Sequence, residues 1–193
     1  EMWHWTRAHI NFAPVSFYYM LPGGKSNIRP DVENAKEPVV LKRADLISPV
    51  IANNKIEAES MVFKQAGGGN FRYQNSKKYG WSDNMQAFWS DAKAGDKLSL
   101  TFESEEAGEF EVSARITLAP DYGKFLISLN GEAASSEVDG YSDKPTVQTI
   151  NLGRFKLQEG TNTLEITVKA ARPNEKKTAF FGLDYLSFHK AGI

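Results

Sequence analysis

The chain has 193 residues, of which 41% are hydrophobic and 12% aromatic, a composition typical of a folded domain. Its 23 basic and 24 acidic side chains are mixed along the sequence and leave a net charge of -1, which excludes a basic footprint for nucleic acid. The absence of cysteine excludes disulfides, thiolate zinc sites and cysteine nucleophiles, and no apolar run reaches the roughly 20 residues that span a bilayer.

Three regions follow one another along the chain. Residues 1–25 begin with a dense aromatic block in which Val15, Phe17 and Tyr19 alternate as in a strand. Residues 26–54 are polar, contain three prolines and are typical of a connector. From residue 55 to 193 the pattern is that of an all-β domain. The chain starts with Glu1 rather than Met, so we expect a trimmed or excised product.

Period-two alternation predicts the strands of the third region. The segment KIEAESMVF (55–63) reads as a first strand, and AGGGNF (66–71) as a flexible loop. Segments 97–103 and 109–118 are predicted to form an antiparallel pair, and Asn130 with Gly131 predicts a hairpin. Further strands are expected around residues 150–152, 164–168 and 183–188. Short strands without helical periodicity between them predict a jelly-roll β-sandwich.

Three acidic residues suggest a metal site. Glu57 and Glu59 are two residues apart in the first strand, so both side chains are expected on one face. Asp184 lies in the last strand, which often neighbours the first in a jelly roll. Carboxylates gathered without histidine or cysteine suit a structural Ca²⁺ ion. The alternative is a solvent-exposed acidic face on an edge strand.

Catalytic motifs are missing from the sequence. LPGGKS (21–26) lacks the first glycine of a phosphate-binding loop, and no serine occupies a nucleophile elbow. The three histidines His4, His9 and His189 are scattered. We therefore predict no catalytic residues in this chain, although two carboxylates that meet in space, as in an intact small glycosidase, leave no signature in sequence.

The blocks IEAE, GDKLSLTF, AGEFEVSARIT, EGTNTLEITV and LDYL resemble, in order and spacing, carbohydrate-binding modules of families 6 and 35. The resemblance covers residues 55–189. It implies a β-sandwich that holds Ca²⁺ through Glu57, Glu59 and Asp184, and a carbohydrate partner. The front segment WHWTRAHINFAPVSFYYMLPGG resembles the end of the catalytic domain of glycoside hydrolase family 172, the DUF2961 group.

The second resemblance implies a larger parent enzyme. Residues 1–25 would be the end of its jelly-roll hydrolase domain, and most of that domain would lie outside this chain. It also implies export to the periplasm, the cell surface or the medium. The sandwich would then either bind glycans for the hydrolase or act as a structural or oligomerisation domain, as in a homo-oligomer.

Loop aromatics beside polar side chains are the expected sugar-binding residues, because rings cover the apolar face of a sugar while amides and carboxylates bind its hydroxyls. One loop offers Tyr79 and Trp81 beside Asp83 and Asn84. Tyr122, next to Asp121, and Tyr141, near Asp139, lie in two further loops. The alternative places these aromatics, with Phe88 and Trp89, in the core or at an interface to the hydrolase domain.

Overall fold

The computed structural model describes residues 22–24, 48–172 and 177–191. The chain divides into two units, Glu1–Arg43 and Ala44–Ile193, and the described sandwich belongs to the second. The strand expected within residues 1–20 and most of the connector lie outside the described residues. The proposed region boundaries at residues 25 and 54 therefore stay predictions.

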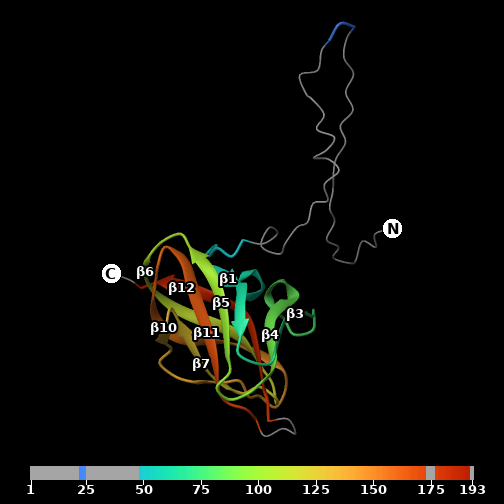
Figure 1. Ribbon diagram of the computed structural model, residues 1–193, viewed down its shortest axis with the longest axis vertical. Helices are drawn as coiled ribbons and strands as arrows, with labels where there is room; N and C mark the ends of the chain where they lie inside the picture. The colour runs from blue at the N-terminus through green and yellow to red at the C-terminus, as the bar shows by residue number, and fades with distance from the viewer. Residues whose placement is uncertain (1–21, 25–47, 173–176, 192–193) are drawn as a thin grey trace. The chain divides into compact units, whose positions relative to one another are not determined.

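The second unit is a sandwich of two antiparallel sheets (Figure 1). One sheet has the order β10-β6-β12-β4-β3, with β1 paired to β12. Its strands are β10 (Thr146–Leu157), β6 (Gly108–Leu118), β12 (Ala179–Lys190), β4 (Met85–Ala92), β3 (Asn70–Asn75) and β1 (Lys55–Glu57). This architecture confirms the predicted all-β sandwich.

The other sheet has the order β2-β5-β11-β7-β8, with β9 paired to β7. Its strands are β2 (Val62–Ala66), β5 (Lys97–Ser104), β11 (Gly160–Ala170), β7 (Lys124–Leu129), β8 (Glu132–Ala133) and β9 (Val138–Asp139). Two single-turn 3-10 helices, η1 (Ala58–Ser60) and η2 (Ser82–Asn84), interrupt the strand pattern. No helix in the described ranges is long and apolar enough to cross a membrane.

The core lies between the sheets and follows the predicted alternation. Leu98, Leu100 and Phe102 of β5 are fully buried, and so is Ile116 on the inner face of β6. Trp89 of β4 is also in this core, which agrees with the alternative that placed it there rather than at a binding site. Each such side chain contributes roughly 1.5–3 kcal/mol when it leaves water, so the apolar stripes hold the two sheets together.

The predicted pairing of the strands now called β5 and β6 is wrong. β5 pairs with β2 and β11, whereas β6 pairs with β10 and β12 in the other sheet. The short segment between them crosses the sandwich, so the apolar face of each strand packs against the opposite sheet. Alternation shows which face of a strand is buried, but it does not identify the partner strand. A short connection can join two neighbouring strands of one sheet, or it can cross from one sheet to the other.

Two turns are better defined than the sequence suggested. The hairpin at Asn130 and Gly131 is confirmed, because both have positive φ (53° and 83°) between the paired strands β7 and β8. The glycine-rich segment, predicted as a flexible loop, is a short crossing between the two sheets, since β2 ends at Ala66 and β3 begins at Asn70. At Gly69 (φ 71°) an added Cβ would lie 2.4 Å from the carbonyl oxygen of Ser90, so only glycine fits.

The predicted first strand is also interrupted. β1 ends at Glu57, η1 turns the chain, and β2 continues in the other sheet. Glu57 and Glu59 therefore do not share one face of a single strand, because Glu59 lies in η1. The expected proximity of the first and last strands is nevertheless confirmed: β1 pairs with β12, and Glu57 is opposite Tyr185. This pairing brings the end of β1 close to Asp184.

Candidate functional site

A pocket of about 200 Å³ opens on the outer face of the sheet that contains β4 and β12. Along β4, Ala87 and Trp89 face the core, so Gln86 and Phe88 face the opposite side. Thr117 of β6 and Phe180 of β12 line the same hollow, which Ala119 and Pro145 complete. The loop of residues 76–84 contributes Tyr79 and Trp81. The outer face of a sheet is thus converted into a partly enclosed site.

Aromatic side chains form the walls. The Tyr79 and Trp81 rings lie 5.0 Å apart between centroids, at a tilt of 36°. Phe88, Tyr122 and Phe180 make a second small hydrophobic cluster, with Phe88 and Phe180 packed edge to face. Burial raises the pKa of Tyr122 well above that of a free phenol, while a hydrogen bond from Gln86 lowers it, so the hydroxyl stays protonated. These rings form the apolar part of the lining, beside the polar side chains of Gln74, Gln86, Thr117 and Asp121.

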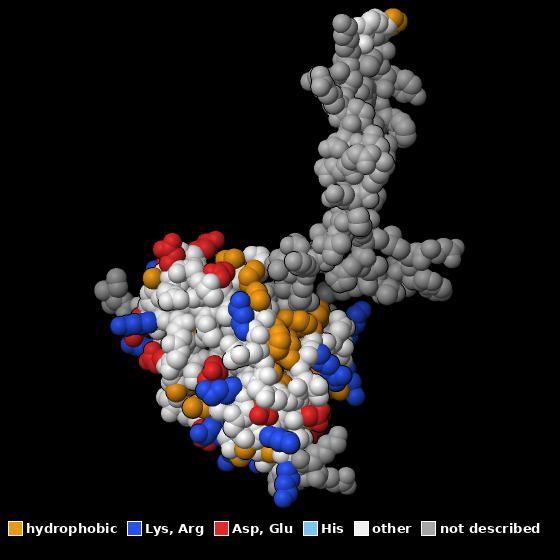
Figure 2. All heavy atoms as spheres, in the orientation of Figure 1, with side chains coloured by type: hydrophobic (Ala, Val, Ile, Leu, Met, Phe, Trp, Pro, Cys, Tyr) orange, Lys and Arg blue, Asp and Glu red, His pale blue; other side chains and the backbone are white. Residues whose placement is uncertain are grey.

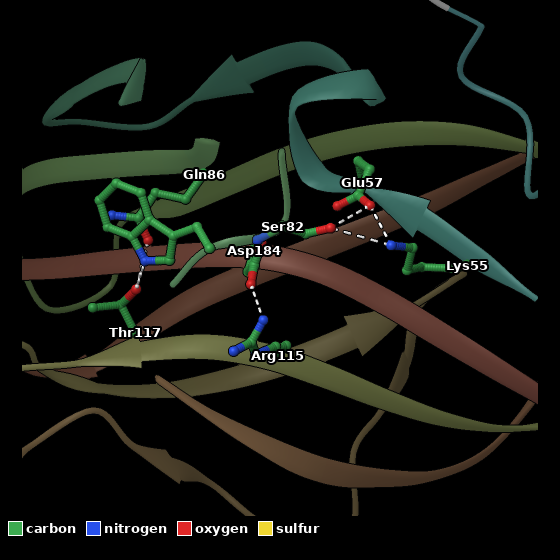
Figure 3. A network of polar contacts seen from close by, with 8 residues as sticks. Lys55, Glu57, Ser82, Gln86, Arg115, Thr117 and Asp184 are labelled. Carbon is green, nitrogen blue, oxygen red and sulfur yellow. Dashed lines mark hydrogen bonds and ion pairs between the residues drawn. The ribbon is translucent and has the colours of Figure 1, made fainter. Parts of the chain in front are cut away.

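A directed chain of hydrogen bonds forms the polar side of the pocket. Figure 3 shows Thr117 and Gln86, which are the middle of this chain. The Trp81 indole N–H donates to Thr117 Oγ1 (2.9 Å), and the Thr117 hydroxyl donates to Gln86 Oε1 (2.7 Å). The Gln86 amide then donates to Gln74 Oε1 (2.7 Å). Since each acceptor is also the next donor, the amides are fixed in one orientation and the chain ends in the NH₂ group of Gln74. A sugar hydroxyl is a suitable acceptor for that group.

The loop of residues 76–84 is closed at its base. The Ser76 N–H donates to the carbonyl oxygen of Asn84 (2.8 Å). Asp83 and Asn84 have left-handed backbones, with φ of 49° and 58°. Asp and Asn tolerate this region better than other non-glycine residues, so both suit the turn. They do not line the pocket.

The sequence-based site residues therefore separate into two groups. Tyr79, Trp81 and Tyr122 come together in the pocket. Asp83 and Asn84 lie in the turn described above, and Tyr141, which is 46% exposed, does not line the pocket. The Tyr141 hydroxyl donates to Asp143 (2.6 Å), and the Arg172 guanidinium lies over its ring. Whether any of the six binds a sugar stays a prediction.

Trp81 itself fits neither of the alternatives set out from sequence. It is 5% exposed, so it is not an open platform, yet its contacts with Tyr79 and Thr117 place it at the pocket. The sequence interpretation also missed Gln74, Gln86 and Thr117. A usable signal existed, because Gln86 and Thr117 are polar residues within otherwise apolar segments, MQAFW and ITLA. Such residues need a partner if both faces of the strand are covered.

The three predicted metal ligands lie near one another beside this pocket. Glu57 Oε1 accepts hydrogen bonds from the Ser82 hydroxyl (2.8 Å) and from Lys55 Nζ. Asp184 is fully buried, and its two oxygens accept from the Ser82 backbone N–H (2.9 Å) and from Arg115 (3.0 Å). Figure 3 shows these side chains meeting around Ser82. We call Glu57, Glu59 and Asp184 the acidic cluster.

Burial leaves the acidic cluster short of positive charge. The pKa of Glu59 is raised to about 7, chiefly because the side chain is desolvated and then because Glu57 and Asp184 are negative. Burial likewise raises the pKa of Asp184 to about 6, although Ser82 and Arg115 act in the opposite direction. Both groups resist ionisation in the absence of a further cation.

The residues fit a calcium ion in their donor chemistry. Glu57 Oε2 is buried and accepts no hydrogen bond from the described residues, so one hard oxygen ligand is available. Among the described residues, however, no group of three His, Asp or Glu side chains is close enough together to hold a metal ion. Because Asp184 would share its carboxylate with Arg115, backbone carbonyl oxygens would have to supply the remaining ligands.

Solved structures share this fold. A Paenibacillus xanthan lyase matches 76% of this chain with a TM-score of 0.64 and 18% identity, and the chain spans 14% of that enzyme. A family 35 carbohydrate-binding module from an environmental isolate matches 72% of this chain and 98% of its own length, with a TM-score of 0.50 and 15% identity. The sandwich therefore has the fold of a complete carbohydrate-binding module.

At the sequence level, the chain matches no described protein family and no curated protein. The resemblance of residues 1–25 to glycoside hydrolase family 172 thus stays a prediction.

Proposed function

We propose that the sandwich is an accessory carbohydrate-binding module, and that it binds a sugar in the pocket between Tyr79, Trp81 and Tyr122. The observation that carries this proposal is the pocket itself. Aromatic walls suit the CH faces of a sugar ring, and the oriented amides of Gln74 and Gln86 suit its hydroxyls. The fold of the family 35 module supports the same class of ligand.

The size of the pocket points to a small ligand. Drug-sized molecules fill pockets of about 300–1,000 Å³. A volume of about 200 Å³ suits one monosaccharide ring better than several consecutive ones. Catalysis is not part of the proposal. Of the residues that line the pocket, Asp121 alone has a carboxylate, whereas glycosidases use two.

The test is a glycan array probed with the full 193-residue chain, followed by calorimetry on the sugars that it selects. Tyr79→Ala is expected to weaken binding by about fivefold to tenfold, the size of an aromatic contact. Tyr79 is the better choice because removing the buried Trp81 also removes a hydrogen bond that holds the loop.

Phe63→Ala is the matched control, since Phe63 is an exposed aromatic residue that does not line the pocket. Tyr141→Ala tests the sequence-based prediction for that residue separately. Binding that is lost equally in the Phe63 and Tyr79 variants would contradict a site in the pocket. Failure to bind any glycan would remove the proposal.

The second candidate is a structural or oligomerisation domain. The burial of Trp81 and its hydrogen bond to Thr117 favour it, because a binding platform usually leaves its main aromatic ring accessible. Light scattering of the chain, with and without the glycans tested, distinguishes the two. An oligomer that binds no sugar would support the structural role.

We propose further that Glu57 and Glu59, with Asp184, hold a structural Ca²⁺ ion. Support comes from the unpartnered Glu57 Oε2 and from the raised pKa of Glu59, since a cation would stabilise both ionised groups. Saturating Ca²⁺ is expected to raise the unfolding temperature by about 5–10 °C over EDTA. Glu59→Gln should abolish the increase, whereas Glu137→Gln, at an exposed ion pair, should not. Equal unfolding temperatures in Ca²⁺ and EDTA would contradict the site.

We also propose that the domain serves a larger glycoside hydrolase that is exported from the cytoplasm. The resemblance of residues 1–25 supports this, as does the occurrence of the same fold as a small part of a xanthan lyase. Mass spectrometry of the secreted proteins of the source cells, searched for peptides of this chain and of sequence preceding it, tests both points.

A further inference from the structure

Two neighbouring residues connect the pocket with the acidic cluster. Trp81 has an extended backbone (φ -65°, ψ 147°), and its side chain and that of Ser82 bind partners on different strands, Thr117 of β6 and Glu57 of β1. Its indole therefore points into the pocket toward Thr117, while the side chain of Ser82 points toward Glu57. Figure 3 shows the contact between Ser82 and Glu57. The position of one side chain thus depends on the anchoring of the other.

Ser82 is anchored to two strands at once. Its backbone N–H donates to Asp184 Oδ1 of β12 (2.9 Å), and its hydroxyl donates to Glu57 Oε1 of β1 (2.8 Å). Its hydroxyl oxygen also accepts from Lys55 Nζ (3.2 Å). Hydrogen bonds to ionised groups are the strong ones, so these contacts fix the middle of the loop of residues 76–84 on a rigid frame.

Within this loop, the other supports of residues 81 and 82 are backbone hydrogen bonds of the single turn η2: the Asn84 N–H donates to the carbonyl oxygen of Trp81 (3.1 Å), and the Met85 N–H donates to that of Ser82. The base of the loop is closed by the backbone hydrogen bond between Ser76 and Asn84, several residues from Tyr79. Tyr79 lies against Trp81 and is half-exposed. Both rings of this wall therefore depend on the position of residues 81 and 82.

We propose that Ser82 is a positioning residue, which holds Trp81 and Tyr79 in the geometry that the pocket needs by linking them to Glu57 and Asp184. The proposal rests on the proposed sugar-binding function of the pocket. It adds a specific role for the acidic cluster, which then organises the binding site as well as the fold.

The first measurement needs no ligand. Hydrogen exchange of the Trp81 indole N–H is followed by NMR on the full chain, with Trp81→Phe to assign the resonance. Ser82→Ala removes the hydroxyl contact, so the indole is expected to exchange about tenfold faster than in the wild type. Ser82→Thr keeps a hydroxyl and should restore slow exchange, which a loss of packing alone would not explain.

Ser90→Ala is the matched control, because the Ser90 hydroxyl also donates to a carboxylate, that of Asp91, but Ser90 does not line the pocket. If Ser82→Ala does not fold, Ser82→Cys carries the same comparison, since a thiol keeps the volume and donates only weakly. Indole exchange that is unchanged in Ser82→Ala would overturn the proposal.

The second measurement is calorimetry with methyl glycosides of glucose, galactose, mannose and xylose. For any glycoside that the wild type binds, Ser82→Ala should weaken binding by about tenfold and Ser82→Thr should restore it. Unchanged binding would overturn the role of Ser82 even though the pocket binds sugar. If the wild type binds none of these sugars and no glycan of the array, the proposed function fails. Faster indole exchange in Ser82→Ala would in that case still support the anchoring of Trp81.

Discussion

Glu59 and Asp184 keep their protons in the folded state at pH values where free carboxyls have lost them. The pKa of Glu59 rises from 4.5 to about 7 and that of Asp184 from 3.8 to about 6, mainly through burial. Between these values the folded state binds more protons than the unfolded state. The free energy of unfolding must therefore fall as pH rises through this window, on the order of 3 kcal/mol for Glu59.

Urea unfolding in EDTA, at several pH values between about 4 and about 8, measures this fall. Glu59→Gln is expected to remove most of it, because an amide does not titrate. Saturating Ca²⁺ should flatten or reverse it, since metal binding favours the ionised carboxylates. If stability in EDTA rises with pH across the window, these carboxyls are ionised in the folded state and the account of the acidic cluster is wrong.

At the scale of elements, β12 serves the pocket and the acidic cluster together. It pairs with β1, β4 and β6, carries Asp184, and passes beneath Gln86 at Gly182. An added Cβ at Gly182 would lie 2.3 Å from Gln86 Oε1, so Gln86 can accept from Thr117 only because residue 182 is glycine.

Gly182→Ala is expected to displace Gln86, break its hydrogen bond with Thr117 and lower the free energy of unfolding by about 1–3 kcal/mol. Urea unfolding measures the loss of stability. The Gly182→Ala variant should also bind glycans more weakly than the wild type. Gly67→Ala is the control, because its nearest atom would be at an ordinary 3.4 Å. Equal stability of the two alanine variants would mean that Gln86 moves aside at little cost.

The same elements show what sequence can predict here. Alternation identified the buried faces of β5 and β6, because burial of one face of a strand is a local property of period two. It did not identify their partners, since pairing depends on strands that are distant along the chain, such as β11 for β5 and β10 for β6. The turn η1 was missed for a similar reason: KIEAESMVF has the alternation of one strand, but its two halves pair in different sheets.

The residues of the candidate site also divide into those that the sequence predicts and those that it does not. Tyr79, Trp81 and Tyr122 could be predicted because aromatic residues in polar loops are unusual. Gln86 and Thr117 stand out in the sequence as polar residues among apolar ones, but this signal does not assign them to a pocket, since polar residues on the outer face of a strand normally meet solvent. Only the loop of residues 76–84, folded over that face, turns them into the buried side of a pocket.

At the scale of the whole molecule, the charges cancel. The net charge is -1, and Figure 2 shows acidic and basic side chains interspersed over the visible face of the sandwich. Near the pocket, the carboxylate of Asp121 is in the lining, while Arg72 lies over the Phe88 ring and Lys78 over the Tyr79 ring. Such a surface has no sustained field of one sign to attract a polyanion.

The sugar bound by this pocket is therefore expected to be uncharged, with binding nearly independent of salt. Raising NaCl from about 0.05 M to about 0.5 M shortens the Debye length severalfold, yet the dissociation constant should change by less than about twofold. Calorimetry at both concentrations tests this with whichever glycan the array selects. Lys64→Gln serves as the control, because Lys64 is an exposed residue of β2, in the sheet that does not carry the pocket. A steep loss of affinity with salt, shared by Arg72→Gln or Lys78→Gln but not by the control, would instead identify an acidic polysaccharide.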